Sequence, residues 1–164
     1  MVMGKLTVRT AEPADSAAVV DIHVRARRSY YEGFLPEADL AGWADSVRAT
    51  GYAELFDRPN RVWLCAELDG QVVGFALVTT GAAPELLQIH VDPDRWRAGV
   101  GEALHDACVE VWRQDGARAA HLEVFEPNAR ARAFYAKLGW HEVERAEAGD
   151  PPHVRLKLPV SDLR

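Results

Sequence analysis

The stretch from Val91 to Leu104, VDPDRWRAGVGEAL, decides which fold the rest of the chain is expected to form. A strand-like run ends at Val91, Pro93 turns the chain, and Gly99 and Gly101 lead into the clearest helical pattern, Gly101–Gln114. Glycines let a backbone approach a ligand closely. The first amides of a helix lack internal partners and carry the positive end of its dipole. The stretch therefore predicts an anion site suited to a pyrophosphate.

Two other kinds of phosphate-binding loop do not fit this stretch. A Walker loop requires Gly-Lys-Ser or Gly-Lys-Thr, and neither occurs in the sequence. A dinucleotide-binding loop needs a third glycine three residues after Gly101, where the chain has Leu104. Two glycines alone would also fit a plain turn that caps a helix, so the rest of the chain has to decide.

Outward from this stretch, strand and helix patterns alternate. Strands are expected at Leu6–Thr10, Arg61–Glu67, Gln71–Thr80, Glu85–Val91, Ala117–Phe125, Trp140–Arg145 and His153–Leu158. Helices are expected at Ala14–Tyr31, Leu40–Phe56 with an interruption near Thr50-Gly51, Gly101–Gln114 and Ala129–Leu138. Asp69-Gly70 between two apolar runs predicts a tight hairpin. The strand–helix–strand order of the second half suggests parallel pairing there, and hairpins elsewhere suggest antiparallel pairing. A mixed sheet covered by helices follows.

Composition narrows the function classes. The chain has 164 residues, of which 48% are apolar and 27% charged, as expected for one soluble domain. A net charge of −6 argues against nucleic-acid binding, which needs a basic face. No apolar run approaches a membrane span, and the N-terminus lacks the pattern of a signal peptide. Cys65 and Cys108 have no metal or redox spacing and are expected to be reduced core thiols in a cytoplasmic protein.

Two motifs make the chain similar to the GNAT superfamily of N-acetyltransferases. The first, a strand ending in valine, then a proline and Gly-x-Gly opening a helix, is matched by Val91, Pro93, Gly99, Gly101 and Leu104. The second, Asn-x-x-Ala-x-x-Phe-Tyr-x-x-x-Gly-aromatic, is matched by Asn128, Ala131, Phe134, Tyr135, Gly139 and Trp140. The resemblance covers essentially the whole chain. It departs at Trp96, Arg97 and Ala98, where the family usually has Gln or Arg, Gly and a basic residue; Arg95 and Arg97 are the basic residues nearby.

The resemblance implies an α/β fold, with a mixed, mostly antiparallel central sheet of about seven strands flanked by about four helices. It implies a single acetyltransferase domain over residues 1–164. The implied activity is transfer of an acetyl group from acetyl-CoA, the cosubstrate, to a primary amine by direct attack in a ternary complex, without a metal. The alternative is a non-catalytic acyl-CoA-binding regulatory module of the same fold.

The resemblance also implies which residues hold the coenzyme. The amide of Ile89 is expected to meet the acetyl carbonyl, and the backbone of Val91 to pair with the pantetheine arm, which inserts beside this strand. Asn128 is expected to contact the coenzyme, to cap the last helix, or both. The full predicted set is Ile89, His90, Val91, Arg97, Ala98, Gly99, Val100, Gly101, Glu102, Asn128, Arg132 and Tyr135.

The chemistry requires a base, an acid and an oxyanion partner, because only about one alkyl amine in 2,500 is unprotonated at pH 7. Tyr135 matches the family tyrosine whose hydroxyl lies near the coenzyme sulfur and serves as the acid. The base is either Glu85, which some family members have four residues before Ile89, or His90, whose imidazole titrates near neutrality. Glu123 on the next strand is a third candidate.

The acceptor is not encoded in these motifs. In the family it is chosen by the first helices, their connecting loop and the last strands, where this chain has Tyr30, Tyr31 and Phe34 as candidate substrate-binding residues. Together with Trp43, Glu32, Glu37 and Asp39 they could hold an amine by cation–π and ionic contact, or form a packed helix pair with a solvated rim. A small-molecule amine and a peptide amine both fit. The family includes dimers, and the sequence favours neither a monomer nor a homodimer.

Overall fold

The computed structural model describes residues 4–96, 98–145 and 152–160. Within them the chain forms seven strands and four α-helices. The strands are β1 Leu6–Thr10, β2 Arg61–Leu68, β3 Gln71–Thr79, β4 Leu86–Val91, β5 Ala119–Phe125, β6 His141–Arg145 and β7 His153–Pro159. The helices are α1 Ser16–Tyr31, α2 Glu37–Thr50, α3 Val100–Gln114 and α4 Ala129–Lys137. The α/β fold class predicted from the sequence is confirmed.

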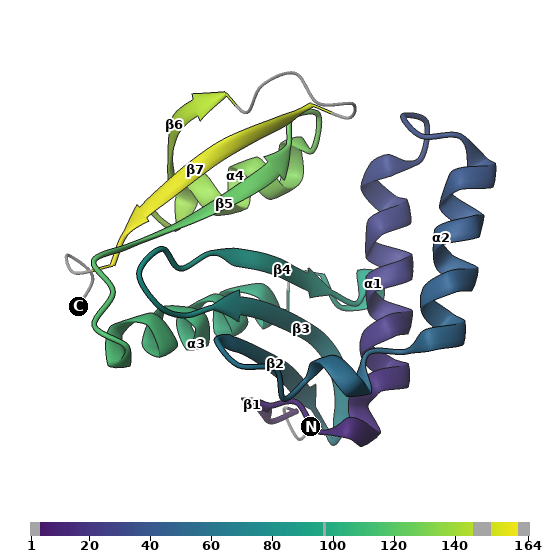
Figure 1. The fold of residues 1–164 in the computed structure, drawn as a ribbon. Helices are drawn as coiled ribbons and strands as arrows, with labels where there is room; N and C mark the ends of the chain where they lie inside the picture. Colours follow the sequence, from purple (N-terminus) through teal and green to yellow (C-terminus); the bar gives the residue numbers. More distant parts are fainter. Residues whose placement is uncertain (1–3, 97, 146–151, 161–164) are drawn as a thin grey trace.

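The strands form two sheets, one in the order β1-β2-β3-β4 and one in the order β5-β7-β6 (Figure 1). The β2–β3 hairpin pairs Leu68 with Gln71 across a two-residue turn. Both turn residues have positive φ, 53° at Asp69 and 80° at Gly70, as a tight hairpin turn requires. The predicted Asp-Gly hairpin is therefore confirmed.

The expected parallel pairing in the second half of the chain is wrong, because β5 and β6 each pair antiparallel with β7. Helices do separate β4, β5 and β6 along the chain, but the last strand, β7, inserts between β5 and β6. The parallel contact that the structure describes between the sheets is an isolated bridge between Glu85 and His121. A strand–helix–strand order thus predicts that two strands lie near each other, but not which strands hydrogen-bond to each other.

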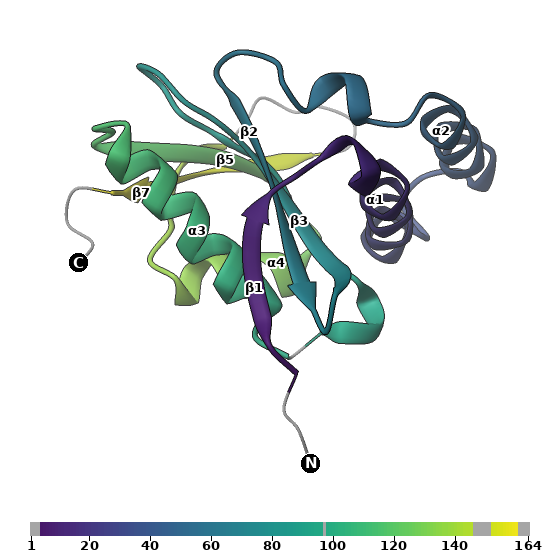
Figure 2. The ribbon, with the colours of Figure 1, turned by 90° about the horizontal axis from the view of Figure 1, so that it is seen from below.

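Helices cover the two faces of the first sheet (Figure 2). On β2, Leu64 and Ala66 face the core that contains α3, whereas Trp63 and Cys65 face the core that contains α1. This alternation follows from the two-residue period of a strand. The predicted apolar stripe of α3 is confirmed by its innermost side chains, which are fully buried: Leu104, Cys108 and Trp112.

The second predicted helical stretch, Leu40–Phe56, begins earlier than expected, and the interruption expected near Thr50-Gly51 is confirmed. The helix α2 begins three residues earlier, at Glu37, directly after Pro36, which has a φ of −57° that suits a helix start. It ends at Thr50 because Gly51 has a φ of 70°, and a separate short 3₁₀ turn follows at Ala53–Leu55. The helices α1 and α2 form an antiparallel arm beside the sheets (Figure 1).

Candidate active site

A cleft of about 790 Å³ opens between the two sheets, lined by β4 and β5 and by α1, α3 and α4. The sheets meet where the His121 amide donates to the Pro84 carbonyl at 3.1 Å. Beyond this contact β4 and β5 diverge (Figure 1). The cleft therefore exists because two neighbouring strands separate instead of completing one sheet.

A β-bulge in β4 accompanies this divergence. Leu77 of β3 lies opposite Gln88, whereas the next residue, Val78, lies opposite Leu86, so Leu87 is the extra residue. A bulge bends its strand and re-aims the side chains that follow it. In consequence Gln88 and His90 face α1, while Ile89 and Val91 pack toward the core that contains α3.

The outer edge of β4 presents peptide groups to the cleft. The Asp92 amide donates to the Val73 carbonyl at 2.8 Å, and hydrogen-bonded positions alternate along an antiparallel ladder. Ile89 and Val91 therefore turn their peptide groups away from β3, and both residues line the cleft. The Val91 carbonyl accepts a hydrogen bond from the Trp96 indole at 3.3 Å, as expected for a carbonyl that points away from β3. The backbone roles predicted for Ile89 and Val91 have the required orientation.

The N-terminus of α3 lies on the same cleft, and no side chain among the described residues caps it. Gly99 begins the helix with a φ of 80°, a conformation that suits glycine. A side chain at position 101 would be crowded, since a Cβ there would lie 3.1 Å from the Phe134 ring. The uncapped amides of the first turn keep their positive dipole end available for an anion. Of the predicted residues in this segment, Gly99, Val100, Gly101 and Glu102 line the cleft.

Only some of the basic side chains at this end of the cleft are those predicted from the sequence. Arg95 and Arg130 line it, and the Arg130 guanidinium lies 3.2 Å from the centre of the Trp96 ring. Arg97 lies outside the described residues. Ala98, which was also predicted to bind the coenzyme, does not line the cleft.

Arg132 does not line the cleft either. It donates to the Glu126 carbonyl at 3.1 Å and lies 3.9 Å from the Glu142 carboxylate. Residues two apart on a helix point about 200° away from each other, so Arg130 and Arg132 cannot share a face. The helical period could not have identified Arg130 from the sequence, because Arg132, three residues before Tyr135, lies nearer to the face of Tyr135 than Arg130, five residues before it.

Asn128 and Tyr135 both line the cleft from α4. The Asn128 Oδ1 accepts from the Ala131 amide at 3.1 Å, so the predicted cap is confirmed. Tyr135 is buried, and burial, with a smaller effect of Tyr30, raises the pKa of its phenol above the usual range. The phenol therefore carries its proton at neutral pH. Among the described residues no hydrogen bond to its hydroxyl is formed.

His90 lines the cleft on the side of α1. Its Nε2 lies 2.6 Å from the Gln88 Oε1, and its ring stacks on His23 with centroids 4.8 Å apart. Burial, together with His23, lowers the pKa of His90 well below its ordinary value, so the imidazole is neutral at pH 7. His23 is buried, which lowers its pKa to about 4. The sequence prediction missed His23, because its place on α1 reads as an ordinary core position.

The two carboxylates considered as bases lie in different places. Glu85 does not line the cleft: it sits where the sheets meet, and its amide donates to the Thr79 Oγ1 at 2.8 Å. Glu123 on β5 does line the cleft, 3.8 Å from the Arg155 guanidinium. Of the two leading candidates for the base, only His90 borders the cleft.

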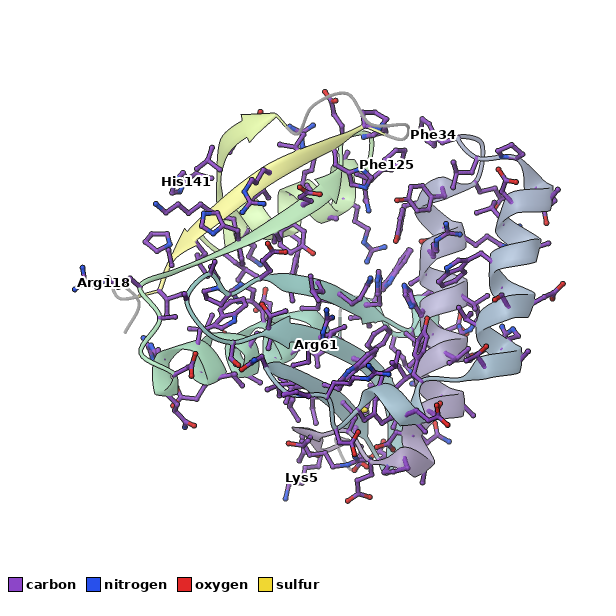
Figure 3. The ribbon with its side chains drawn as sticks, in the orientation of Figure 1. Lys5, Phe34, Arg61, Arg118, Phe125 and His141 are labelled. Carbon is purple, nitrogen blue, oxygen red and sulfur yellow. The ribbon has the colours of Figure 1, made fainter. Side chains whose placement is uncertain are left out.

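The end of the cleft beside α1 is aromatic. Tyr30, Tyr31 and Phe34 all line it, as expected for candidate substrate-binding residues. Phe34 reaches across to Phe125 of β5, with ring centroids 5.2 Å apart (Figure 3). The Tyr30 ring lies parallel to that of His90 at 6.2 Å.

Three other side chains considered for this region do not line the cleft, namely Trp43, Glu37 and Asp39. Glu37 instead forms an ion pair with Arg28 at 2.7 Å.

Two further findings concern metals and membranes. Among the described residues, no three His, Cys, Asp or Glu side chains are grouped so that they could hold a metal ion. No helix in the described part of the chain is both long and apolar enough to span a bilayer.

Comparison with known proteins gives consistent matches. Residues 20–140 match the model of the acetyltransferase (GNAT) family. An aminoglycoside N(6′)-acetyltransferase type 1 of Stenotrophomonas maltophilia is 30% identical over 156 residues, covering 88% of this chain and 92% of that protein. An uncharacterised N-acetyltransferase of Methanocaldococcus jannaschii is 25% identical over 146 residues, covering 84% of this chain; the chain spans only 62% of that relative's length. The crystal structure of the PaiA N-acetyltransferase of Thermoplasma acidophilum, in complex with coenzyme A, superposes with a TM-score of 0.83 at 18% identity, covering 94% of this chain and 99% of that one.

Proposed function

Because the chain belongs to the acetyltransferase (GNAT) family, we propose that it transfers an acetyl group from acetyl-CoA to a primary amine by direct attack in a ternary complex. One observation carries the proposal. A single cleft combines the uncapped N-terminus of α3, the outward peptide groups of β4, and an acid–base pair formed by Tyr135 and His90. These are the parts that acyl transfer from a phosphorylated thioester needs.

The residues around α3 fit the coenzyme. A Cβ at Gly101 would lie 3.1 Å from Phe134, so glycine lets α3 begin in close contact with α4. The first amides of α3 suit a pyrophosphate, and Arg95 and Arg130 add positive charge at the same end of the cleft. The outward peptide groups of Ile89 and Val91 would hydrogen-bond the amides of the pantetheine arm, in the way that the edge of a sheet binds an additional strand. Bound there, acetyl-CoA supplies the activated acyl group.

His90 is the base in this proposal. With Nε2 donating to the Gln88 amide oxygen, Nδ1 carries the free lone pair and accepts a proton. The lowered pKa of His90 keeps the imidazole unprotonated at neutral pH, at the cost of a smaller proton affinity. This is sufficient because an amine nitrogen becomes far more acidic once it bonds to the acyl carbon.

Tyr135 is the acid, and Ile89 the oxyanion partner. The raised pKa of the Tyr135 phenol keeps its proton on oxygen, so the phenol can donate a hydrogen bond to the thiolate sulfur as the carbon–sulfur bond breaks. The Ile89 amide, aimed into the cleft, donates to the carbonyl oxygen as negative charge develops there. Base and acid thus border one cleft from opposite elements, β4 and α4.

Two measurements test the proposal. Acetyl-CoA at millimolar concentration should raise the melting temperature, because a ligand that binds only the folded state stabilises it. A panel of amines, assayed by thiol release, should contain at least one acceptor. Absence of any melting shift would contradict the proposal. Stabilisation without turnover of any amine would favour the non-catalytic acyl-CoA-binding module instead.

We further assign residues 1–164 to one acetyltransferase domain of the reducing cytoplasm. In support, Cys65 and Cys108 are both free and buried. Burial raises the pKa of each thiol to about 12, which makes them poor nucleophiles.

A further inference from the structure

The two ends of the cleft differ in charge. The end beside α3 and α4 carries Arg95, Arg130 and the positive end of the α3 dipole. The end beside α1 carries the carboxylates of Glu32 and Glu123. An anionic coenzyme is therefore drawn to one end and an ammonium ion to the other.

A single carboxylate dominates the second end. Of the glutamates that line the cleft, Glu102 pairs with Lys137 at 3.0 Å and Glu123 lies 3.8 Å from Arg155. Among the described residues Glu32 forms no salt bridge; Arg28 interacts with its charge but is paired with Glu37, so Glu32 is the least compensated of the three glutamates. One carboxylate suits one ammonium group, whereas a polycation would leave most of its charges uncompensated.

The walls of this end are aromatic. Tyr31 and Phe125 are buried and contact each other with centroids 4.8 Å apart. Phe34 packs edge-on against Phe125 but keeps 59% of its surface exposed (Figure 3). An apolar partner in the cleft would be stabilised by covering the exposed surface of this ring. Because aromatic pairs gain from edge and offset contacts beyond the area they bury, an aromatic partner fits best.

These rings lie next to the reacting centre. The Tyr30 ring faces that of His90 at 6.2 Å and lies 6.4 Å from that of Phe125. A molecule with its nitrogen at His90 would thus extend along Tyr30 toward Phe125 and Phe34. The rings and the carboxylate of Glu32, which precedes Phe34 by two residues, lie at the same end.

We infer that the acceptor is a primary amine with a single positive charge, carried on an aromatic or bulky apolar group. The inference rests on the proposed function and adds the substrate class. The same chemistry is offered by a small arylalkyl amine and by a peptide that begins with an aromatic residue.

The test compares three amines: 2-phenylethylamine, ethylamine and spermidine. The kcat/KM for 2-phenylethylamine should exceed the other two by at least about tenfold. Phe34→Ala should reduce that preference several-fold without changing the KM for acetyl-CoA. Leu55→Ala is the matched control, since Leu55 is another exposed apolar side chain, lies outside the cleft, and should leave the preference unchanged. A preference for ethylamine or spermidine, or one unchanged by Phe34→Ala, would overturn the inference.

Calorimetry separates this inference from the proposed function. With coenzyme A present, 2-phenylethylamine should bind the wild-type chain, and Phe34→Ala should weaken its Kd. Stabilisation by acetyl-CoA together with no binding or turnover of 2-phenylethylamine would overturn the acceptor class alone. Absence of stabilisation by acetyl-CoA would instead contradict the proposed function. A short peptide with an N-terminal phenylalanine distinguishes the sources, since faster turnover than 2-phenylethylamine would identify a peptide acceptor.

Discussion

His23 of α1 and His90 of β4 stack ring on ring, with centroids 4.8 Å apart and planes inclined by 25°. The inner ring, His23, is held by a 2.8 Å hydrogen bond between its Nδ1 and the Tyr52 hydroxyl. It is also packed edge-on against Trp43 and Phe75. The outer ring, His90, borders the cleft. Burial lowers the pKa of both rings, with Arg27 adding to the effect on His23 and His23 to the effect on His90, so both stay neutral in the folded protein.

The first prediction concerns this pair and acid stability. Folding lowers the pKa of His23 from 6.5 to about 4 and that of His90 well below 6.5. Between the folded and unfolded values the unfolded chain binds more protons, so the stabilisation is complete above pH 6.5 and is lost as the pH falls toward 4. Each histidine should contribute a slope of up to about 1.4 kcal/mol per pH unit in that window.

Urea unfolding between pH 7.5 and 4.5 measures this slope. His23→Phe should reduce the slope of unfolding free energy against pH, because the replacement ring does not titrate. The control is His141→Gln, a change at an exposed position, which should leave the slope unchanged. An equal slope in wild type and His23→Phe would contradict the assignment.

The second prediction separates the two candidate bases. His90→Gln should lower kcat by about 100-fold or more, since general-base catalysis contributes that much. Glu85→Gln should change kcat little, because Glu85 does not line the cleft. Steady-state kinetics with a true acceptor measure both, and melting temperatures show that each variant folds. The reverse order of effects would identify Glu85 as the base.

The third prediction concerns the acid. Tyr135→Phe keeps the ring contacts with Phe134 and Trp140 but removes the hydroxyl, so folding and coenzyme affinity should stay unchanged. The kcat should fall by about 100-fold, in the range of general-acid effects. Stabilisation by acetyl-CoA serves as the binding control. Unchanged turnover would remove Tyr135 from the mechanism.

The fourth prediction uses two arginines of α4 as a matched pair. Arg130→Ala should weaken acetyl-CoA binding several-fold, because a cleft-lining cation is lost from the α3 end. Arg132→Ala should have no such effect, since Arg132 is directed to Glu126 and Glu142. Titration calorimetry with coenzyme A compares the affinities of the two variants. Added salt should weaken coenzyme binding to the wild type more than coenzyme binding to Arg130→Ala. Equal losses in both variants would contradict the assignment of Arg130.

The sequence by itself determined the features that depend on neighbouring residues. The hairpin at Asp69-Gly70, the glycines before α3 and the Asn128 cap are local, because turn dihedrals and first-turn amides are satisfied within a few residues. The family was also readable, since its two motifs are short and fixed in spacing.

Only the tertiary structure decided how distant elements meet. It separated β4 from β5, turned the second-half pairing antiparallel, and excluded Glu85 and Arg132 from the cleft. It also brought His23 behind His90, 67 positions further along the chain. These outcomes depend on the path of the sheets and on the helical rotation of single side chains. Such long-range geometry leaves no periodic signal in the sequence, because one position on a helix or strand looks the same whether it faces a core, a cleft or a second imidazole.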